Sequence, residues 1–195
     1  RPSNRLNATF INKMPKPGNI AFISQSGALG SAILDWAIHE NIGFSNFVSL
    51  GSMIDVDFGD LIDYFGTDSK TRSILMYVEG ITRAREFMSA ARHFARTKPI
   101  IVVKAGKFGE SARAAASHTG SLKGDREIWN AFFRQTGAVR IGSMNEMLDA
   151  TMSFLRLEPA LGVKAAVLGI GGGATVANGD ICGEEGIETP PLSEK

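Results

Sequence analysis

The sequence has little cysteine, no excess of one charge and no long apolar run, and each shortage excludes a class of function. Cys182 is the single cysteine, which excludes an internal disulfide and a cysteine-based zinc site and leads us to expect a cytoplasmic location. No apolar run approaches the ~20 residues that a membrane helix needs. The first residues lead into no apolar signal segment, so we expect no secretory signal.

The charge is balanced. The 21 basic and 20 acidic residues leave a formal net charge of +1, and the basic residues are scattered along the chain. Nucleic acids and anionic membrane surfaces are bound by basic patches, so we expect neither as a partner.

Apolar runs and glycine are plentiful by contrast. The chain has 195 residues, of which 44% are hydrophobic and 22 are glycine. This length suits one complete α/β domain and a piece of another. Many glycines follow apolar runs directly, as in a ligand-binding α/β protein.

Five short apolar runs alternate with helical patterns, which predicts a parallel sheet covered on both faces. After an irregular lead-in over residues 1–18, we expect strands at 19–24, 47–50, 73–78, 100–104 and 138–141. Helices are expected near 27–40, 61–65, 84–94, 128–133 and 144–155. The fold class is therefore α/β, with a flavodoxin-like doubly wound sheet of strand order 2-1-3-4-5.

The pattern breaks at Pro159 and Gly162. Residues 165–170 predict a new strand, and Gly171, Gly172 and Gly173 follow it, but the GxGxxG spacing is not completed. About 30 residues cannot close a second sheet. We therefore expect residues 163–195 to be the truncated start of a second α/β domain in a fragment of a longer protein.

Two segments repeat one motif. Residues 24–30 and 115–122 both place Ser or Thr before Gly, then a small residue and Leu, between an apolar run and a helical pattern. Such helix starts leave backbone N–H groups unpaired and attract anions, phosphate above all. The second copy contains His118, which indicates a side chain that is itself phosphorylated.

In the order 2-1-3-4-5, ligands bind where strands 1 and 3 separate. Ser24–Gly30 follows strand 1, Glu79 follows strand 3, and His118 follows strand 4, so we expect all three at one edge of the sheet. Simpler alternatives remain open: Ser26 and Gly27 could only cap a helix, and Glu79 could only face solvent.

Other candidate residues favour simpler explanations. Asp55 and Asp57 could bind a metal, but a solvated acidic turn is favoured because no third ligand is near in the sequence. His39 and His93 lie in amphipathic helices and are expected at the surface. We predict no metal site in this chain.

Four segments carry a resemblance to a known family: 18–30 (GNIAFISQSGALG), 76–81 (MYVEGI), 104–122 (KAGKFGESARAAASHTGSL) and 133–149 (FRQTGAVRIGSMNEMLD). Together they strongly resemble the NDP-forming acyl-CoA synthetases, the ADP-forming acetyl-CoA synthetases and relatives of succinyl-CoA synthetase. The resemblance covers about residues 6–190.

The resemblance implies a domain plan. Residues 1–17 would be the tail of a missing CoA-binding Rossmann domain, 18–158 a flavodoxin-like domain carrying the phosphohistidine loop, and 163–195 the start of the next domain. An ATP-grasp domain or subunit would be a further partner, and the full enzyme would be an oligomer. The implied ligands are CoA, ATP/ADP, phosphate, a small carboxylic acid or its acyl-CoA, and Mg²⁺ on the missing nucleotide-binding module.

The resemblance also implies roles for residues. His118 matches the phosphorylated histidine, and Glu79 matches the glutamate that orients its ring. A carboxylate that accepts Nδ1–H leaves Nε2 free to attack phosphorus. The phosphate would rest on the two helix starts, at Ser24, Ser26, Gly27, Ala28, Thr119 and Gly120.

One position departs from the family, and two other functions stay open. Ser52 stands where the family usually has Asn, which affects the expected acyl preference. The same domains also occur fused to GNAT-type lysine acetyltransferases as a regulatory acyl-CoA sensor, often with the histidine replaced, so His118 favours the ligase. A generic mononucleotide- or flavin-binding domain is the third hypothesis, and it would not need this histidine.

Overall fold

The computed structural model describes residues 1–9, 13–106, 126–157 and 162–191. His118, Thr119 and Gly120 lie outside these described residues. The chain divides into two compact units, residues 1–157 and 158–195.

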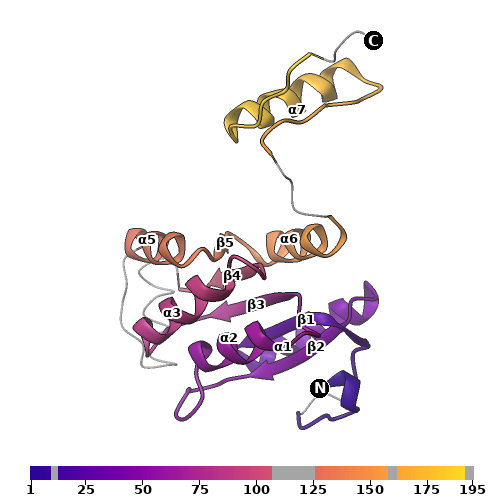
Figure 1. Ribbon diagram of the computed structural model, residues 1–195. Coiled ribbons are helices and arrows are strands. Elements are labelled where there is room, and N and C mark those ends of the chain that lie inside the picture. Colours follow the sequence, from indigo (N-terminus) through magenta and orange to yellow (C-terminus); the bar gives the residue numbers. More distant parts are fainter. Residues whose placement is uncertain (10–12, 107–125, 158–161, 192–195) are drawn as a thin grey trace. The chain divides into compact units, whose positions relative to one another are not determined.

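The first unit is built on a five-stranded parallel sheet of order β2-β1-β3-β4-β5 (Figure 1). The predicted order 2-1-3-4-5 is confirmed. The strands are β1 (Pro17–Ser24), β2 (Phe44–Ser49), β3 (Ser73–Val78), β4 (Ile100–Lys104) and β5 (Val139–Ile141). Strands β1, β3 and β4 each contain a continuous apolar run, because both faces of the sheet are covered.

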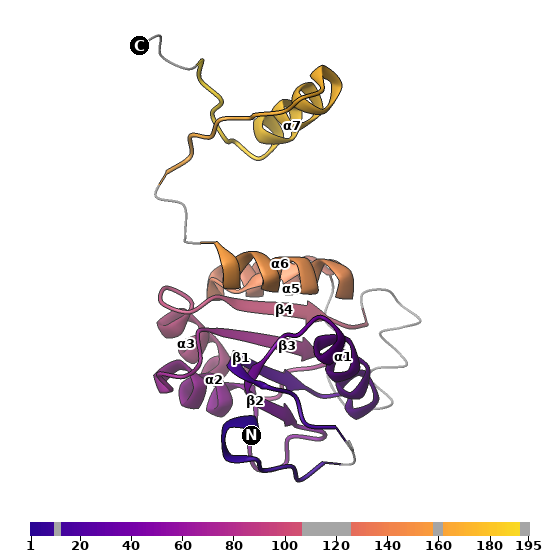
Figure 2. The same cartoon turned by 90° about the vertical axis from the view of Figure 1, so that its right-hand side faces the viewer.

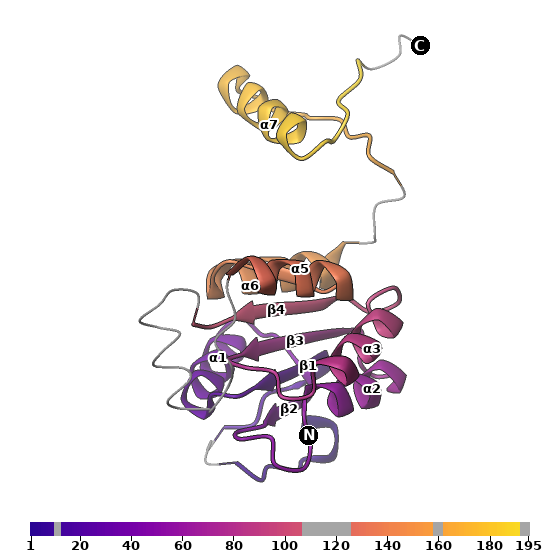
Figure 3. The ribbon, with the colours of Figure 1, turned by 90° about the vertical axis from the view of Figure 1, so that its left-hand side faces the viewer.

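Helices α1 (Gly27–His39) and α6 (Met144–Arg156) cover one face, and α2 (Phe58–Thr67), α3 (Ala84–Phe94) and α5 (Arg126–Thr136) cover the other. Figure 2 shows the first face toward the viewer and Figure 3 the second. Alternate residues of one strand enter opposite cores, since Ile23 belongs to the α2–α3 cluster and Phe22 to the α1–α6 cluster.

Helices α2 and α3 pack closely because Gly66 has no side chain. A Cβ at Gly66 would lie 2.3 Å from the ring of Phe94, which is itself in the core. The close approach brings Phe65 and Phe94 into one cluster with the sheet.

The lead-in is more regular than predicted. A 3₁₀ turn, η1 (Pro2–Asn4), begins it, and β1 already starts at Pro17, since the first position of a strand tolerates proline. From the lead-in, Arg1, Pro2, Leu6, Asn7 and Met14 line one pocket together with Asn46 and Phe47 of the edge strand β2. The lead-in therefore lies along this edge of the sheet.

The second unit, within residues 162–191, contains α7 (Gly172–Glu184) and one isolated parallel bridge between Lys164 and Glu188. The strand predicted at 165–170 is wrong, because these residues form no strand. A strand forms only against a partner, and the bridge pairs Lys164, the residue before this run. Leu168 is 84% exposed and Ile170 fully so. Among the described residues of both units, no helix is long and apolar enough to cross a membrane.

Candidate functional site at the carboxyl edge of the sheet

The carboxyl ends of four strands lie in one row. Ser24 pairs in register with Ser49 of β2 and Tyr77 of β3, and Val78 pairs with Lys104 of β4. The loops that follow these strands therefore start side by side, at the edge where doubly wound folds bind ligands.

The start of α1 is a formed helix cap. Ser26 is the N-cap, and its Oγ accepts a hydrogen bond from the N–H of Leu29 at 3.3 Å. Ser24 Oγ donates to the Ser26 carbonyl at 2.8 Å and accepts from the Ser26 N–H at 3.1 Å, which fixes the turn. Gly27 and Ala28 are exposed, and the N–H groups at these two positions have no acceptor within a helix. Capping and anion binding are thus compatible.

Glu79 begins directly after β3 and is half-buried. The side-chain oxygen Oε1 of Gln25 accepts hydrogen bonds from the N–H of Glu79 at 2.6 Å and of Gly80 at 3.0 Å. On the other side, Lys104 Nζ donates to the carbonyl of Glu79 at 2.8 Å. The backbone of Glu79 is consequently held from β1 and from β4 at once.

Lys104 is a buried cation, with only 4% of the residue exposed. Burial, reinforced by the charge of Arg140 and opposed by that of Glu79, lowers the pKa of Lys104 to about 8. The ring of Trp129 lies 4.6 Å from the ammonium and favours its charged form. Burial and then the charge of Glu79 raise the pKa of Tyr77.

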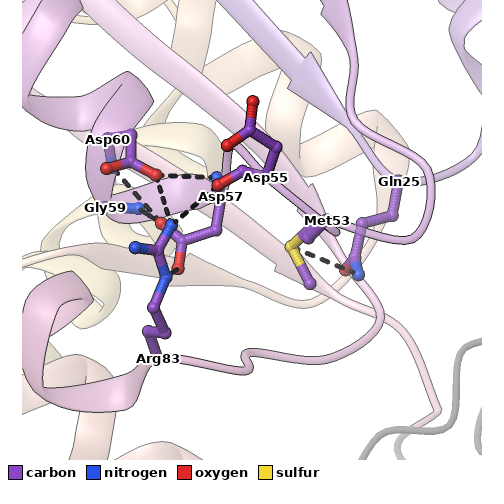
Figure 4. Close-up of polar contacts among 7 residues, drawn as sticks. All are labelled: Gln25, Met53, Asp55, Asp57, Gly59, Asp60 and Arg83. Carbon is purple, nitrogen blue, oxygen red and sulfur yellow. Dashed lines mark hydrogen bonds and ion pairs between the residues drawn. The ribbon is translucent and has the colours of Figure 1, made fainter.

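The acidic turn after β2 is structural. Asp57 is 3% exposed and caps α2. Its Oδ1 accepts a hydrogen bond from the N–H of Gly59 at 2.7 Å, and the Asp60 carboxylate accepts one from the N–H of Asp57 at 2.9 Å (Figure 4). Arg83, from the loop after β3, reaches Asp57 Oδ2 at 2.7 Å and also pairs with Asp60. The expectation of a solvated turn is wrong for Asp57, which is buried and bonded both to the start of α2 and to Arg83.

The same bonds shape the electrostatics of this turn. The N–H of Asp57, which donates to the Asp60 carboxylate, holds the pKa of Asp60 below its usual range, and Arg83 lowers it further. Within the described ranges, no group of three or more His, Cys, Asp or Glu side chains could hold a metal ion.

The structure brings Ser24, Ser26, Gly27, Ala28 and Glu79 to one edge of the sheet. The Gln25 bonds to the Glu79 segment connect the two loops directly. Whether His118 completes the group stays a prediction. His39 and His93 are exposed on their helices, as expected.

Sequence reasoning missed Gln25, Lys104 and Arg83. Lys104 had a usable signal, since it ends an otherwise wholly apolar strand, IIVVK. Gln25 stands between a buried strand and a helix cap and is 6% exposed, a position where a polar side chain needs partners. Arg83 gave no signal, because an arginine before a helix is ordinary.

Three comparisons bear on these features. The family model of the succinyl-CoA ligase-like flavodoxin domain matches residues 17–154. The alpha subunit of an ADP-forming acetate–CoA ligase II from Pyrococcus furiosus is 43% identical over 190 residues, which is 97% of this chain and 41% of the relative. An ADP-forming 4-hydroxybutyrate–CoA ligase from Nitrosopumilus maritimus is 34% identical, over 96% of this chain and 27% of the relative.

The fold agrees with the sequence matches. A solved acetyl-coenzyme A synthetase 1 from Ca. Korarchaeum cryptofilum, in complex with phosphate and ADP, superposes with a TM-score of 0.89 at 43% identity, over 97% of this chain and 42% of that one. The chain thus spans about two-fifths of the Pyrococcus and Korarchaeum proteins and about a quarter of the Nitrosopumilus ligase. The relatives are named as ligases or synthetases and give no support to the acetyltransferase-linked sensor.

Proposed function

This chain belongs to the family of succinyl-CoA ligase-like flavodoxin domains, and from that premise we propose that it is the phosphoryl-relay module of an NDP-forming acyl-CoA synthetase. The reaction is acyl-CoA + NDP + phosphate ⇌ acid + NTP + CoA. One observation carries the proposal: the side chain of Gln25, just before α1, is hydrogen-bonded to the Glu79 segment. These two segments follow the neighbouring strands β1 and β3 at the carboxyl edge of the sheet.

His118 is the proposed phosphoryl carrier. The Glu79 carboxylate accepts the Nδ1–H of the neutral imidazole, so that the Nε2 lone pair points at phosphorus. Phosphate first attacks the thioester carbonyl of acyl-CoA, which gives an acyl phosphate and releases CoA. Nε2 then attacks the phosphoryl group of the acyl phosphate, the bond to the carboxylate oxygen breaks, and the acid leaves. Transfer of the same phosphoryl group to an NDP gives the NTP and restores the neutral ring.

The start of α1 is the proposed cradle for the phosphoryl oxygens. Gly27 and Ala28 present N–H groups at the positive end of the helix, and Ser24 and Ser26 fix the turn that aims them. These donors are in place before the charge develops, so they need no reorganisation during transfer. Thr119 and Gly120 are proposed as the matching second helix start.

The remaining parts of the reaction belong to modules outside this chain. We propose residues 1–17 as the tail of a CoA-binding Rossmann domain, 18–158 as the relay domain and 163–195 as the start of the next domain. An ATP-grasp domain or subunit would hold the nucleotide and Mg²⁺, within an oligomer. The chain covers only 27–42% of the length of the reported relatives, which supports such missing parts.

The test uses the complete gene product with its nucleotide-binding partner. Wild type and His118→Ala are incubated with γ-labelled ATP and Mg²⁺. Acid-labile, base-stable label on the wild type alone is expected, because a phosphohistidine has that stability. A folded, ATP-binding wild type that takes up no label would contradict the proposal.

A further inference from the structure

We propose that Gln25 and Lys104 are positioning residues that fix the direction of the Glu79 side chain. Neither touches the reacting atoms in this proposal; both act through the backbone of Glu79. The inference rests on the proposed phosphoryl relay, in which Glu79 orients His118.

Gln25 holds the peptide nitrogens. Its side-chain Oε1 accepts hydrogen bonds from the backbone N–H groups of Glu79 and Gly80, at 2.6 and 3.0 Å. The backbone N–H of Gln25 donates to the Tyr77 carbonyl at 3.3 Å. The amide nitrogen Nε2 points to Met53 Sδ at 3.8 Å (Figure 4). Only the oxygen can accept two N–H bonds, so this orientation of the amide is required.

Lys104 holds the peptide oxygen. Its Nζ donates to the carbonyl of Glu79 at 2.8 Å and to that of Ala105, under the ring of Trp129. A buried ammonium is expensive, and the four residues before it in β4 are apolar. An apolar side chain would avoid the cost of burying the ammonium but would leave the carbonyls of Glu79 and Ala105 without this donor, so what Lys104 contributes here is its hold on these two carbonyls.

The three bonds restrain both peptide planes that flank the Cα of Glu79. The N–H of Glu79 belongs to the preceding plane, whereas its carbonyl and the N–H of Gly80 belong to the following one. Each peptide is planar, so fixing the two planes fixes φ, ψ and the direction of the Cα–Cβ bond. The carboxylate then retains only its side-chain torsions, as a group that orients a catalytic ring requires.

Lys98 provides a matched comparison, because it lies just before β4 whereas Lys104 is the last residue of that strand. Its Nζ also donates to two backbone carbonyls, of Phe65 at 2.9 Å and Asp68 at 2.7 Å, but it precedes β4, at the amino edge of the sheet. Loss of Lys98 removes the same kind of contact without reaching Glu79.

The experiment measures the rate constant of His118 labelling, kcat and the nucleotide KM in the complete enzyme with its nucleotide-binding partner. The variants are Gln25→Leu and Lys104→Met, each alone and combined with Glu79→Gln, with Lys98→Met as control and a thermal melt for every variant. We expect each single variant to label about tenfold more slowly at unchanged KM, since small misplacements of an orienting group slow transfer strongly. Lys98→Met should label at the wild-type rate.

The decisive result is the double variant. If Gln25 and Lys104 act through Glu79, their substitutions should slow labelling no further once Glu79 is Gln. Equal slowing in both backgrounds would overturn the inference, as would wild-type rates in both single variants or in Glu79→Gln alone. Absence of label on the wild type would instead refute the relay itself, so the two failures are distinguishable. If Lys104→Met fails to fold, Gln25→Leu decides the question alone.

Discussion

At the scale of single residues, Lys104 ties the stability of the protein to pH. Its pKa falls from 10.5 to about 8 on folding, so between these values the unfolded chain holds more protons than the folded one. The free energy of unfolding should therefore rise with pH across this window, and the gain should disappear as the pH falls through about 8.

The measurement is urea unfolding of wild type and Lys104→Met at pH 7.5, 8.5 and 9.5. The wild type should gain stability relative to the variant at each step. Parallel pH dependences of the two proteins would show that Lys104 keeps its ordinary pKa in the folded state.

Gly27 offers a second residue-scale prediction. A Cβ there would meet no described atom nearer than Ser49 Oγ at 4.0 Å, so a side chain leaves the fold intact but covers the start of α1. Gly27→Val should raise the KM for phosphate in the complete enzyme at an unchanged melting temperature. Gly27→Ala, the smaller control, should have less effect, and an unchanged KM in Gly27→Val would exclude phosphate from this helix start.

Local chemistry decided which residues could be predicted. The Ser26 cap follows from the sequence, because Ser before a helical pattern has one dominant use. The bonds of Gln25 and Lys104 to Glu79 join positions 54 and 25 residues apart, and the sequence contains no record of such a pairing. The predicted strand order places the ends of β1, β3 and β4 side by side, but it does not say which side chains there form hydrogen bonds.

At the scale of elements, the start of α2 depends on Asp57. Asp57→Ala would remove the cap on Gly59 and leave Arg83 without its 2.7 Å partner. We expect a loss of about 2 kcal/mol in the free energy of unfolding. Chemical denaturation measures it, and Asp55→Ala, an exposed neighbour, is the control that should change stability little.

The packing of α2 on α3 depends on Gly66. Because its Cβ would lie 2.3 Å from the Phe94 ring, Gly66→Ala must push the helices apart or displace the ring. A loss of about 1–3 kcal/mol is expected despite the better helix propensity of alanine. Greater stability in the alanine variant would mean that the two helices have room to adjust.

Elements were predictable where the apolar pattern was strong. The strand predicted at 73–78 and the helix predicted at 84–94 agree with β3 and α3. In each segment the hydrophobic period and the length both indicated the same type of element. The run at 165–170 is also apolar but forms no strand. An apolar run indicates only a preference for strand, and a strand forms only beside a neighbouring strand.

At the scale of the whole molecule, the described part of the second unit, residues 162–191, contains no buried residue. Helix α7 has no buried residue and contains Gly172, Gly173, Gly179 and Gly183. An isolated peptide of residues 162–191 should therefore show little helix by circular dichroism, because thirteen residues with four glycines are too few and too flexible. A strongly helical spectrum would mean that α7 is stable without further packing.

The position of the lead-in along β2 has a consequence for how the protein behaves in concentrated solution. An uncovered edge strand presents unpaired backbone groups on which a second chain can build, which is a common origin of aggregation. Here Arg1, Pro2, Leu6, Asn7 and Met14 lie beside that edge. A shortened form beginning near Pro17 would keep its sheet but lose the residues that lie beside β2. We would therefore expect it to precipitate during purification rather than to unfold.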